Sequence, residues 1–230
     1  MKILGISGSP RPGKTTDQLV REVLRATDAP VEFVSLAGMR IGPCTGCLGC
    51  VNDNICKVKD DMAALREKIV AADALVIGAP NYFDMLNGLS HSFLERFYQF
   101  RHREGGVVSG KLGVAVGVGG GAPEPAARAI EKFFEFNQLE CIGRVLAIGP
   151  ASCFDCGYGE NCTVGAIHHF YGPGTKITEE ITPRLARQPQ AVDQARDLGR
   201  TLRQRLSGVS RQGHLETAPK GKDADDATNS

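Results

Sequence analysis

Residues 2–16 read Lys2-Ile-Leu-Gly-Ile-Ser-Gly-Ser-Pro-Arg-Pro-Gly-Lys-Thr-Thr16. The apolar run from Lys2 to Ser7 is typical of a short buried strand. Apolar residues recur at helical spacing from Thr15 to Ala26, which predicts a helix directly after the intervening glycine- and proline-containing loop. Strand, loop and helix in this order form the first part of a βαβ unit.

The rest of the chain repeats this alternation. Further strands are predicted at Val31 to Leu36, Ala74 to Ala79, Leu112 to Val118 and Cys141 to Ile148. Further helices are predicted at Asp60 to Ala72, Gly88 to Arg101, Glu124 to Asn137 and Ala191 to Leu206. Because crossovers between parallel strands are right-handed, this pattern predicts an α/β fold with a doubly wound, five-stranded parallel sheet. Ligands are then expected at the carboxyl ends of the strands.

Composition is consistent with an intracellular protein. The chain has 230 residues, 42% of them apolar, and a net charge of +1, which gives no reason to expect a nucleic-acid or membrane partner. The apolar run Met1 to Ile6 is far too short to span a bilayer, so we expect a cytoplasmic protein. The predicted organisation is a main domain over residues 1–150 with a cysteine loop at 40–58, an extension over 151–208, and a flexible polar tail over 209–230.

Four cysteines lie within thirteen residues, at Cys44, Cys47, Cys50 and Cys56. The C-x2-C-x2-C spacing folds thiolates around one centre, and the fourth cysteine can close the site. Four thiolates without a histidine suit a 4Fe-4S cluster. Structural zinc also takes four cysteines and is the alternative, although zinc sites usually pair two separated C-x2-C hairpins.

A second cysteine group follows the fifth strand. Its members, Cys153, Cys156 and Cys162, repeat the spacing of the last three cysteines of the first group. His168 or His169 is the candidate fourth ligand, and three sulfurs with one imidazole suit zinc, although an iron-sulfur cluster with an unusual ligand, or free thiols, also fit. We predict an independent structural metal site. Cys141, at the other end of the fifth strand, is expected to be a buried structural thiol.

The loop after the first strand matches the G-x4-G-K-[ST] pattern from Gly8 to Thr15, which raises the alternative of a P-loop nucleotide-binding protein. Pro10 and Pro12 remove backbone donors that such a loop needs, and none of the later predicted strands ends in an acidic residue that could hold magnesium. A monophosphate needs fewer backbone donors than a triphosphate does. The hydroxyls of Ser7, Ser9, Thr15 and Thr16 surround the positive end of the first helix, where an anion is favoured.

Three segments of the chain resemble a known family. The residues Lys2-Ile-Leu-Gly-Ile-Ser-Gly-Ser-Pro-Arg11, Ala79-Pro-Asn-Tyr-Phe83 and Phe93-Leu-Glu-Arg96 resemble the flavodoxin-like NADPH-dependent FMN reductase superfamily. With the cysteine run followed by Lys59-Asp-Asp-Met62, the resemblance extends to its iron-sulfur flavoprotein branch. It implies a flavodoxin-like sheet of order 2-1-3-4-5. It also implies FMN bound by Ser7, Ser9, Pro10, Arg11, Lys14, Thr15 and Thr16 at the phosphate, and by Pro80, Asn81, Tyr82, Phe83, Gly119, Gly120 and Gly121 around the ring.

The two expected cofactors together indicate a function. FMN exchanges two electrons and a 4Fe-4S cluster one, so the pair would form a one-to-two-electron converter in an electron-transfer oxidoreductase. The resemblance implies NAD(P)H or a small redox protein such as ferredoxin as donor, and a homodimer or homotetramer. The alternative is an NAD(P)H-dependent FMN or quinone reductase with structural zinc. No catalytic side chain is predicted, and His91, His102 and His214 are expected to be surface or helix-face residues.

Overall fold

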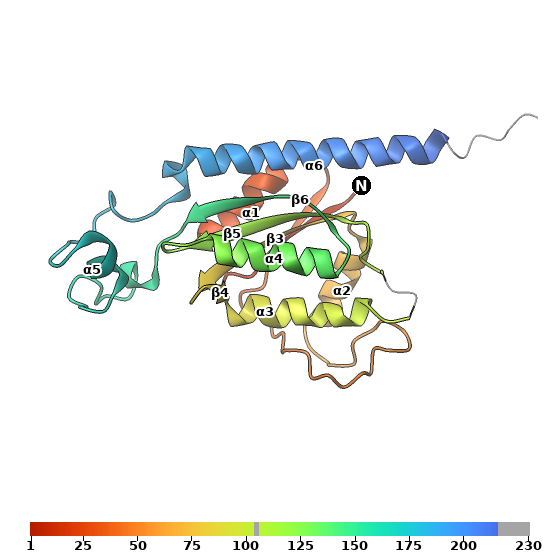
Figure 1. Ribbon diagram of the computed structural model, residues 1–230, viewed down its shortest axis with the longest axis horizontal. Coiled ribbons are helices and arrows are strands. Elements are labelled where there is room, and N and C mark those ends of the chain that lie inside the picture. The colour runs from red at the N-terminus through yellow and green to blue at the C-terminus, as the bar shows by residue number, and fades with distance from the viewer. Residues whose placement is uncertain (104–105, 216–230) are drawn as a thin grey trace, which may run out of the picture.

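The computed structural model describes residues 1–103 and 106–215. Five parallel strands form the sheet in the order β2-β1-β3-β5-β6, and a short strand, β4, pairs antiparallel with β3 (Figure 1). The strands are Ile3–Ser7 (β1), Val31–Ser35 (β2), Ala74–Tyr82 (β3), Met85–Leu86 (β4), Leu112–Gly119 (β5) and Glu140–Ile148 (β6). The predicted doubly wound sheet is therefore confirmed, and numbering the parallel strands alone gives the expected order 2-1-3-4-5.

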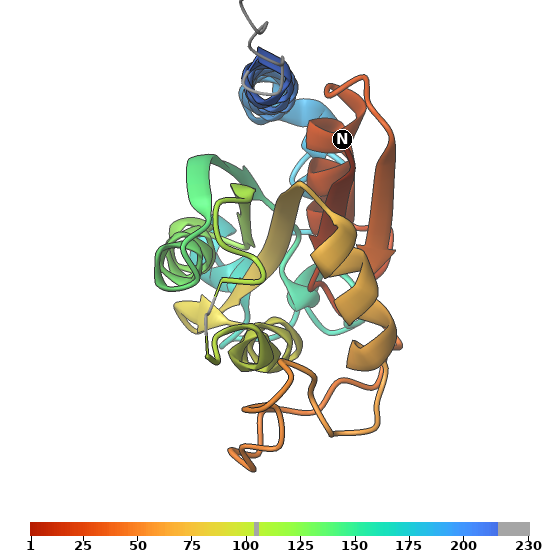
Figure 2. The ribbon, with the colours of Figure 1, turned by 90° about the vertical axis from the view of Figure 1, so that its right-hand side faces the viewer.

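Helices cover both faces of this sheet (Figure 2). The helices α1 (Thr15–Arg25) and α6 (Pro189–Leu215) cover one face, whereas α2 (Met62–Ala71), α3 (Gly88–Glu95) and α4 (Glu124–Phe136) cover the other. The helix predicted from Gly88 to Arg101 is divided, because its second half forms the 3₁₀ helix η1 (Arg96–Phe100). Such tightening of the last turns is common at helix ends.

The sheet lies between two apolar layers. Alternate strand residues point to opposite faces, so Leu4 and Ile6 join the layer beneath α2, α3 and α4, whereas Ile3 joins the layer beneath α1 and α6. A Cβ at Gly78 would lie 2.5 Å from Val20 Cγ2, so α1 crosses β3 too closely for a larger residue. The aromatic side chains of Phe93, Phe97 and Phe100 are buried and meet edge to face, with ring centroids 5.3 and 5.2 Å apart.

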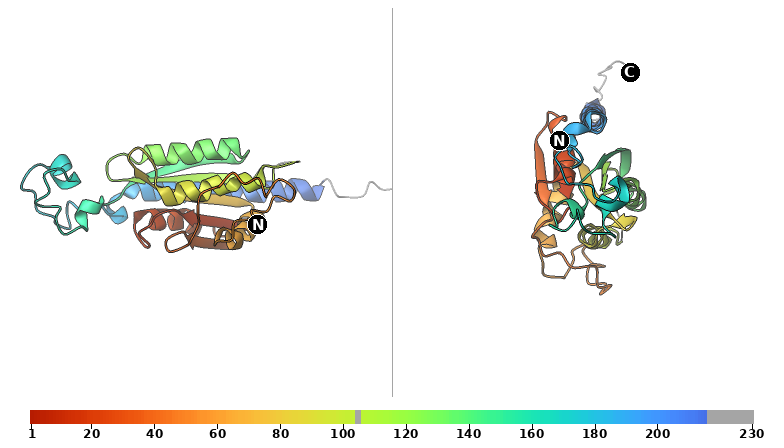
Figure 3. Two further views of the ribbon diagram at one scale, coloured as in Figure 1. Left: turned by 90° about the horizontal axis from the view of Figure 1, so that it is seen from below. Right: turned by 90° about the vertical axis from the view of Figure 1, so that its left-hand side faces the viewer.

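A segment between β6 and α6 projects from the body before the chain returns (Figures 1 and 3). We call residues 151–184 the excursion. It contains the 3₁₀ turn η2 (Ser152–Phe154) and the short helix α5 (Ala166–Tyr171), and a further turn, η3 (Leu185–Arg187), leads into α6. The sequence pattern did not predict β4, α5 or the 3₁₀ turns, because each is too short to show a repeating apolar pattern.

The final helix is longer than predicted. α6 ends at Leu215, so residues 209–215 of the predicted tail are helical, and residues 216–230 lie outside the described part of the chain. A helix that is already formed gains one hydrogen bond for each further residue, so it can extend beyond the apolar pattern that predicts it. Within residues 1–103 and 106–215, we find no helix with the length and apolar character needed to cross a membrane.

Candidate functional site

A pocket of about 300 Å³ lies at the carboxyl edge of the sheet, where the loops after β1, β3, β5 and β6 meet. This is the position at which doubly wound folds bind their ligands. The residues that line the pocket are Ser9, Arg11, Lys14, Thr15, Thr16, Pro80, Asn81, Tyr82, Phe83, Val118, Gly119, Gly120, Gly149, Pro150, Ala151 and Ser152. The structure therefore brings most of the predicted cofactor-binding residues into one cavity.

Three predicted residues lie outside the pocket lining. Ser7 is fully buried at the end of β1, Pro10 is exposed, and the ring of Phe170 covers Gly121, where an added Cβ would lie 2.8 Å from Phe170 Cζ. The prediction missed the wall formed by residues 149–152. The topology alone could have indicated this wall, because the carboxyl end of β6 reaches the same edge of the sheet as β1 and β3.

The phosphate side of the pocket combines buried hydroxyls with a compact loop. Ser9, Thr15 and Thr16 are each at most 5% exposed although they line the pocket. The Gly13 amide donates to Asp17 Oδ2 at 2.7 Å, and the Arg11 amide donates to Ser9 Oγ at 3.2 Å. These internal bonds occupy amides that a P-loop offers to a triphosphate, which counts against the P-loop alternative.

The ring side of the pocket contains a strained hairpin. Phe83 and Asp84 connect β3 to β4 with φ values of 55° and 60°, as a type I′ turn requires. A positive φ is costly for a bulky aromatic residue, and such strain is concentrated at functional sites. The Phe83 side chain is 95% exposed and Tyr82 is also exposed, so neither ring packs in the core.

The pocket also contains an orphaned acceptor. Asn81 Nδ2 donates to the carbonyl oxygen of Ala122 at 2.5 Å, whereas Asn81 Oδ1 is buried and has no hydrogen-bond partner among the described residues. A buried acceptor without a partner costs about 1–3 kcal/mol. A planar heterocycle that carries an N–H group, as the flavin ring does, would satisfy Asn81 Oδ1 and fit this wall.

The first cysteine group lies at the far end of α3. Cys44, Cys47, Cys50 and Cys56 line one small cavity together with Arg96 and Gln99. Three contacts connect these cysteines to α3, to η1 and to the residues after η1. The Cys44 amide donates to Glu95 Oε2 at 3.0 Å, the Cys56 amide donates to Gln99 Oε1 at 3.0 Å, and Cys50 Sγ lies 3.1 Å from His102 Nε2. His102, expected on the surface or on a helix face, is half-buried beside a predicted ligand.

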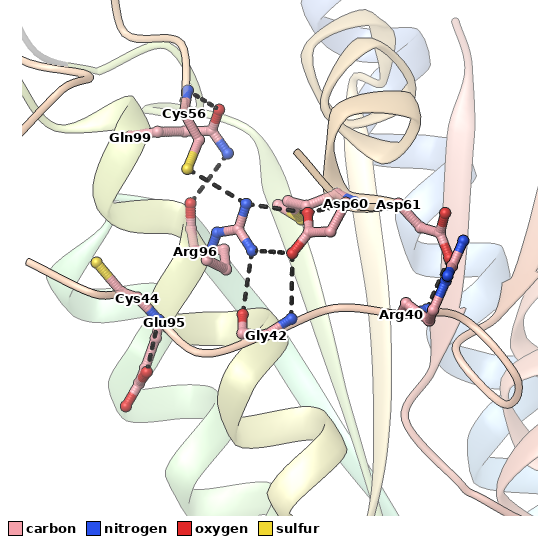
Figure 4. A network of polar contacts seen from close by, with 10 residues as sticks. Arg40, Gly42, Cys44, Cys56, Asp60, Asp61, Glu95, Arg96 and Gln99 are labelled. Carbon is pink, nitrogen blue, oxygen red and sulfur yellow. Dashed lines mark hydrogen bonds and ion pairs between the residues drawn. The ribbon is translucent and has the colours of Figure 1, made fainter. Parts of the chain in front are cut away.

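Arg96 organises the loop that carries these cysteines (Figure 4). Its guanidinium donates to both carboxylate oxygens of Asp60, at 2.5 and 3.1 Å, to the Gly42 carbonyl at 3.1 Å and to Cys56 Sγ at 3.2 Å. The Arg96 side chain is 1% exposed. Burial opposes the charge on Asp60, but the bonds from Arg96 and from the amides of Gly42 and Met62 outweigh it and lower the pKa of Asp60. Arg96 was not predicted as a site residue.

The thiols of the first group have different environments. Burial raises the pKa of Cys50, and the neighbouring cysteines raise it further. Hydrogen bonds, first to the backbone of Gly49 and then to the side chain of Thr45, lower the pKa of Cys47. Among the described residues, no three Cys, His, Asp or Glu side chains converge around a single ion.

The first cysteine group lies away from the carboxyl-edge pocket. Strand order alone predicts both groups at the carboxyl end of the sheet with the flavin site between them, because each group follows the carboxyl end of an edge strand, and for the first group this prediction is wrong. Instead, Asn87, before α3, bonds to Gly8 in the phosphate loop, whereas Glu95 at the other end bonds to Cys44. The loop after β2 runs back beneath α3 (Figure 1). The first group is thus separated from the pocket by the length of α3, about 12 Å for eight residues.

The second cysteine group lies beside the pocket. Its first member, Cys153, directly follows the pocket wall of residues 149–152, and Asp155 lies between the first two cysteines. Asp155 Oδ2 accepts from Arg11 Nη1 at 3.3 Å and lies 3.6 Å from Lys14 Nζ. Cys141 is exposed at the start of the edge strand β6, so the prediction that it is buried is wrong.

Comparisons with known proteins agree with this geometry. The sequence profile of the NADPH-dependent FMN reductase family matches residues 1–149. An iron-sulfur flavoprotein from Methanocaldococcus jannaschii is 35% identical over 149 residues, which cover 62% of this chain and 76% of that protein. One from Methanosarcina thermophila is 29% identical over 149 residues, which cover 62% of this chain and 78% of that protein.

A solved structure shows the same fold. The Trp repressor binding protein from Bacillus subtilis superposes with a TM-score of 0.55 at 21% identity, covering 85% of this chain and 98% of that one. This similarity confirms the flavodoxin-like fold, with cysteine-rich segments after β2 and after β6. The chain therefore belongs to the NADPH-dependent FMN reductase family.

Proposed function

We propose that this protein is an electron-transfer oxidoreductase that binds FMN in the carboxyl-edge pocket and a 4Fe-4S cluster at Cys44, Cys47, Cys50 and Cys56. The main support is the coincidence of buried hydroxyls, an orphaned Asn81 acceptor and exposed aromatic residues in one pocket, in a chain whose relatives are iron-sulfur flavoproteins. When bound, FMN would supply two-electron hydride chemistry and the cluster one-electron transfer.

The residues of the pocket have separate tasks in this proposal. Thr15, Thr16 and Ser9 donate hydroxyl hydrogen bonds to a phosphate at the start of α1, where the helix dipole favours an anion. Arg11 and Lys14 add positive charge there. Asn81 holds the polar edge of the ring, and the hairpin tip at Phe83 shields its face from water.

The residues around the first cysteine group would hold and tune the cluster. The Arg96 guanidinium donates to Cys56 Sγ and so stabilises negative charge on that thiolate. A donor to a ligand sulfur stabilises the reduced, more negative form of a cluster and raises its reduction potential. Because Arg96 also bonds to Asp60 and Gly42, its position is fixed from both sides of the cysteine loop.

The electron route in this proposal runs between two subunits. The first group is separated from its own pocket by α3, so a neighbouring chain is better placed to receive its electrons. We propose a homodimer or homotetramer in which the cluster of one chain faces the flavin of another. The donor would be NAD(P)H or a small ferredoxin-like protein.

A cysteine variant tests this function. Cys47→Ser should abolish electron delivery from a one-electron donor to FMN while FMN stays bound, because the pocket contains no residue of the cysteine loop. Cys141→Ser, at the exposed cysteine on β6, is the matched control and should transfer electrons normally. Anaerobic stopped-flow absorption follows both. Normal flavin reduction in Cys47→Ser would contradict the proposal and favour a reductase whose cysteines hold only zinc.

A further inference from the structure

The excursion lacks a hydrophobic core of its own. Within residues 151–184, all of which the structure describes, Ile167 is the only fully buried apolar side chain. The apolar side chains of Tyr158, Val164, Phe170 and Tyr171 are exposed. A segment of about 35 residues cannot bury enough surface to fix its own conformation, and chains of this size usually need a metal or a disulfide.

Two backbone amides of the excursion donate to its cysteine sulfurs. Cys153 Sγ accepts from the Ala166 amide at 3.2 Å, and Cys156 Sγ accepts from the Tyr158 amide at 3.4 Å. An added Cβ at Gly165 would lie 3.2 Å from Cys162 Sγ, so the third sulfur lies beside the residue that precedes Ala166. Amide donors to ligand sulfurs belong to the outer shell of metal sites, and these contacts gather the sulfurs around the start of α5.

His168 is arranged as metal-ligating histidines are. It lies on α5, which begins at the amide that bonds to Cys153 Sγ. Its Nε2 is 2.9 Å from the carbonyl oxygen of Glu160, an acceptor to which Nε2 would donate, so Nδ1 is the ring nitrogen available to a metal. Metal-bound histidines usually donate their second ring nitrogen to such a carbonyl.

We propose that Cys153, Cys156, Cys162 and His168 form a structural zinc site that holds the excursion against the flavin pocket. Three thiolates and one imidazole are a closed tetrahedral ligand set for zinc. The site lies outside the residues that match the family profile, which end at 149. It fixes one contact with the pocket, because Asp155 bonds to Arg11, and one contact just outside it, because the Phe170 ring lies against Gly121.

Metal analysis of a variant that lacks the first cysteine group tests the zinc site alone. In full-length protein with Cys44, Cys47, Cys50 and Cys56 all replaced by serine, we expect about one tightly bound zinc per chain. Cys156→Ser or Cys162→Ser in that background should remove the zinc, whereas Cys141→Ser should retain it. Cobalt added in place of zinc should give the absorption of a tetrahedral thiolate complex, which His168→Asn should alter.

A second measurement does not depend on either cofactor. Loss of zinc should make proteolytic cleavage within residues 151–184 at least about tenfold faster, while the body stays resistant, since the metal supplies the folding energy of this segment. Three results would overturn the proposal: no tightly held metal in the serine background, iron and sulfide in place of zinc, or a disulfide among the three cysteines in protein handled without oxygen.

Discussion

Arg96→Met removes a buried guanidinium and leaves its partner carboxylate in place. Asp60 is 10% exposed and loses two of its hydrogen bonds, so the variant buries an unpaired charge. Breaking a buried pair in this way costs about 3–5 kcal/mol. For a domain of this size, that cost lowers the melting temperature by roughly 6–20 °C. Arg101→Met, at an exposed arginine just after η1, is the control and should change stability by less than about 0.5 kcal/mol.

The loss of unfolding free energy caused by Arg96→Met should be larger at neutral pH than at acidic pH. In the native protein the pKa of Asp60 lies below its ordinary value of 3.8, so its stabilisation is present above that value and is lost as the pH falls through the lowered pKa. Without Arg96, burial opposes only two backbone donors and the pKa of Asp60 rises. The difference in unfolding free energy should therefore be largest near neutral pH and shrink toward about pH 4.

Urea denaturation of metal-free protein at both pH values gives this difference directly. The metal-free form is suitable because the bonds of Arg96 to Asp60 and Gly42 involve no metal ligand. If Arg96→Met lowers the unfolding free energy by less than about 1 kcal/mol, or by the same amount at pH 7 and pH 4, the role assigned to Arg96 is refuted.

Three further predictions concern the pocket and the assembly. Thr16→Val removes a buried hydroxyl at the phosphate and should weaken FMN binding by about 1–3 kcal/mol in a fluorescence titration, whereas Thr201→Val on α6 should not; equal affinities would remove Thr16 from the phosphate site. Phe83→Gly relieves a positive φ and should stabilise flavin-free protein by about 1 kcal/mol while weakening FMN binding; lower thermal stability would show that the turn is not strained. Light scattering at micromolar concentration should show a dimer or tetramer, and a strict monomer that still transfers electrons between its cofactors would contradict the proposed route.

The sequence was sufficient to predict the five parallel strands because the central ones are almost uninterrupted apolar runs, whereas the expected strand order came from the family resemblance. Buried strands carry this signal on both faces, so β1, β3 and β5 were found within a few residues of their ends. The β3–β4 hairpin was missed. Its turn places Phe83 and Asp84 at positive φ, where the usual signal is Asn-Gly, and only tertiary context can hold an aromatic residue there.

The surroundings of the first cysteine group were harder to predict. Its spacing shows that the thiols act together, but the direction of a loop of more than twenty residues depends on contacts that are distant in sequence. Arg96 and Asp60 are 36 positions apart, and only the fold brings them together. One local signal was present: Arg96 lies between the apolar residues Phe93 and Phe100, where a charged residue must be paired to be buried.

Cofactor analysis of anaerobically purified protein tests the central proposal most directly. Heat-released flavin identified by mass, together with iron and acid-labile sulfide per chain, should show FMN and a 4Fe-4S cluster in the native protein. Cys47→Ser should retain FMN and lose the iron and the low-temperature electron paramagnetic resonance signal of the reduced cluster. Magnesium-ATP in place of FMN, or zinc in place of iron at the first cysteine group, would contradict the proposal.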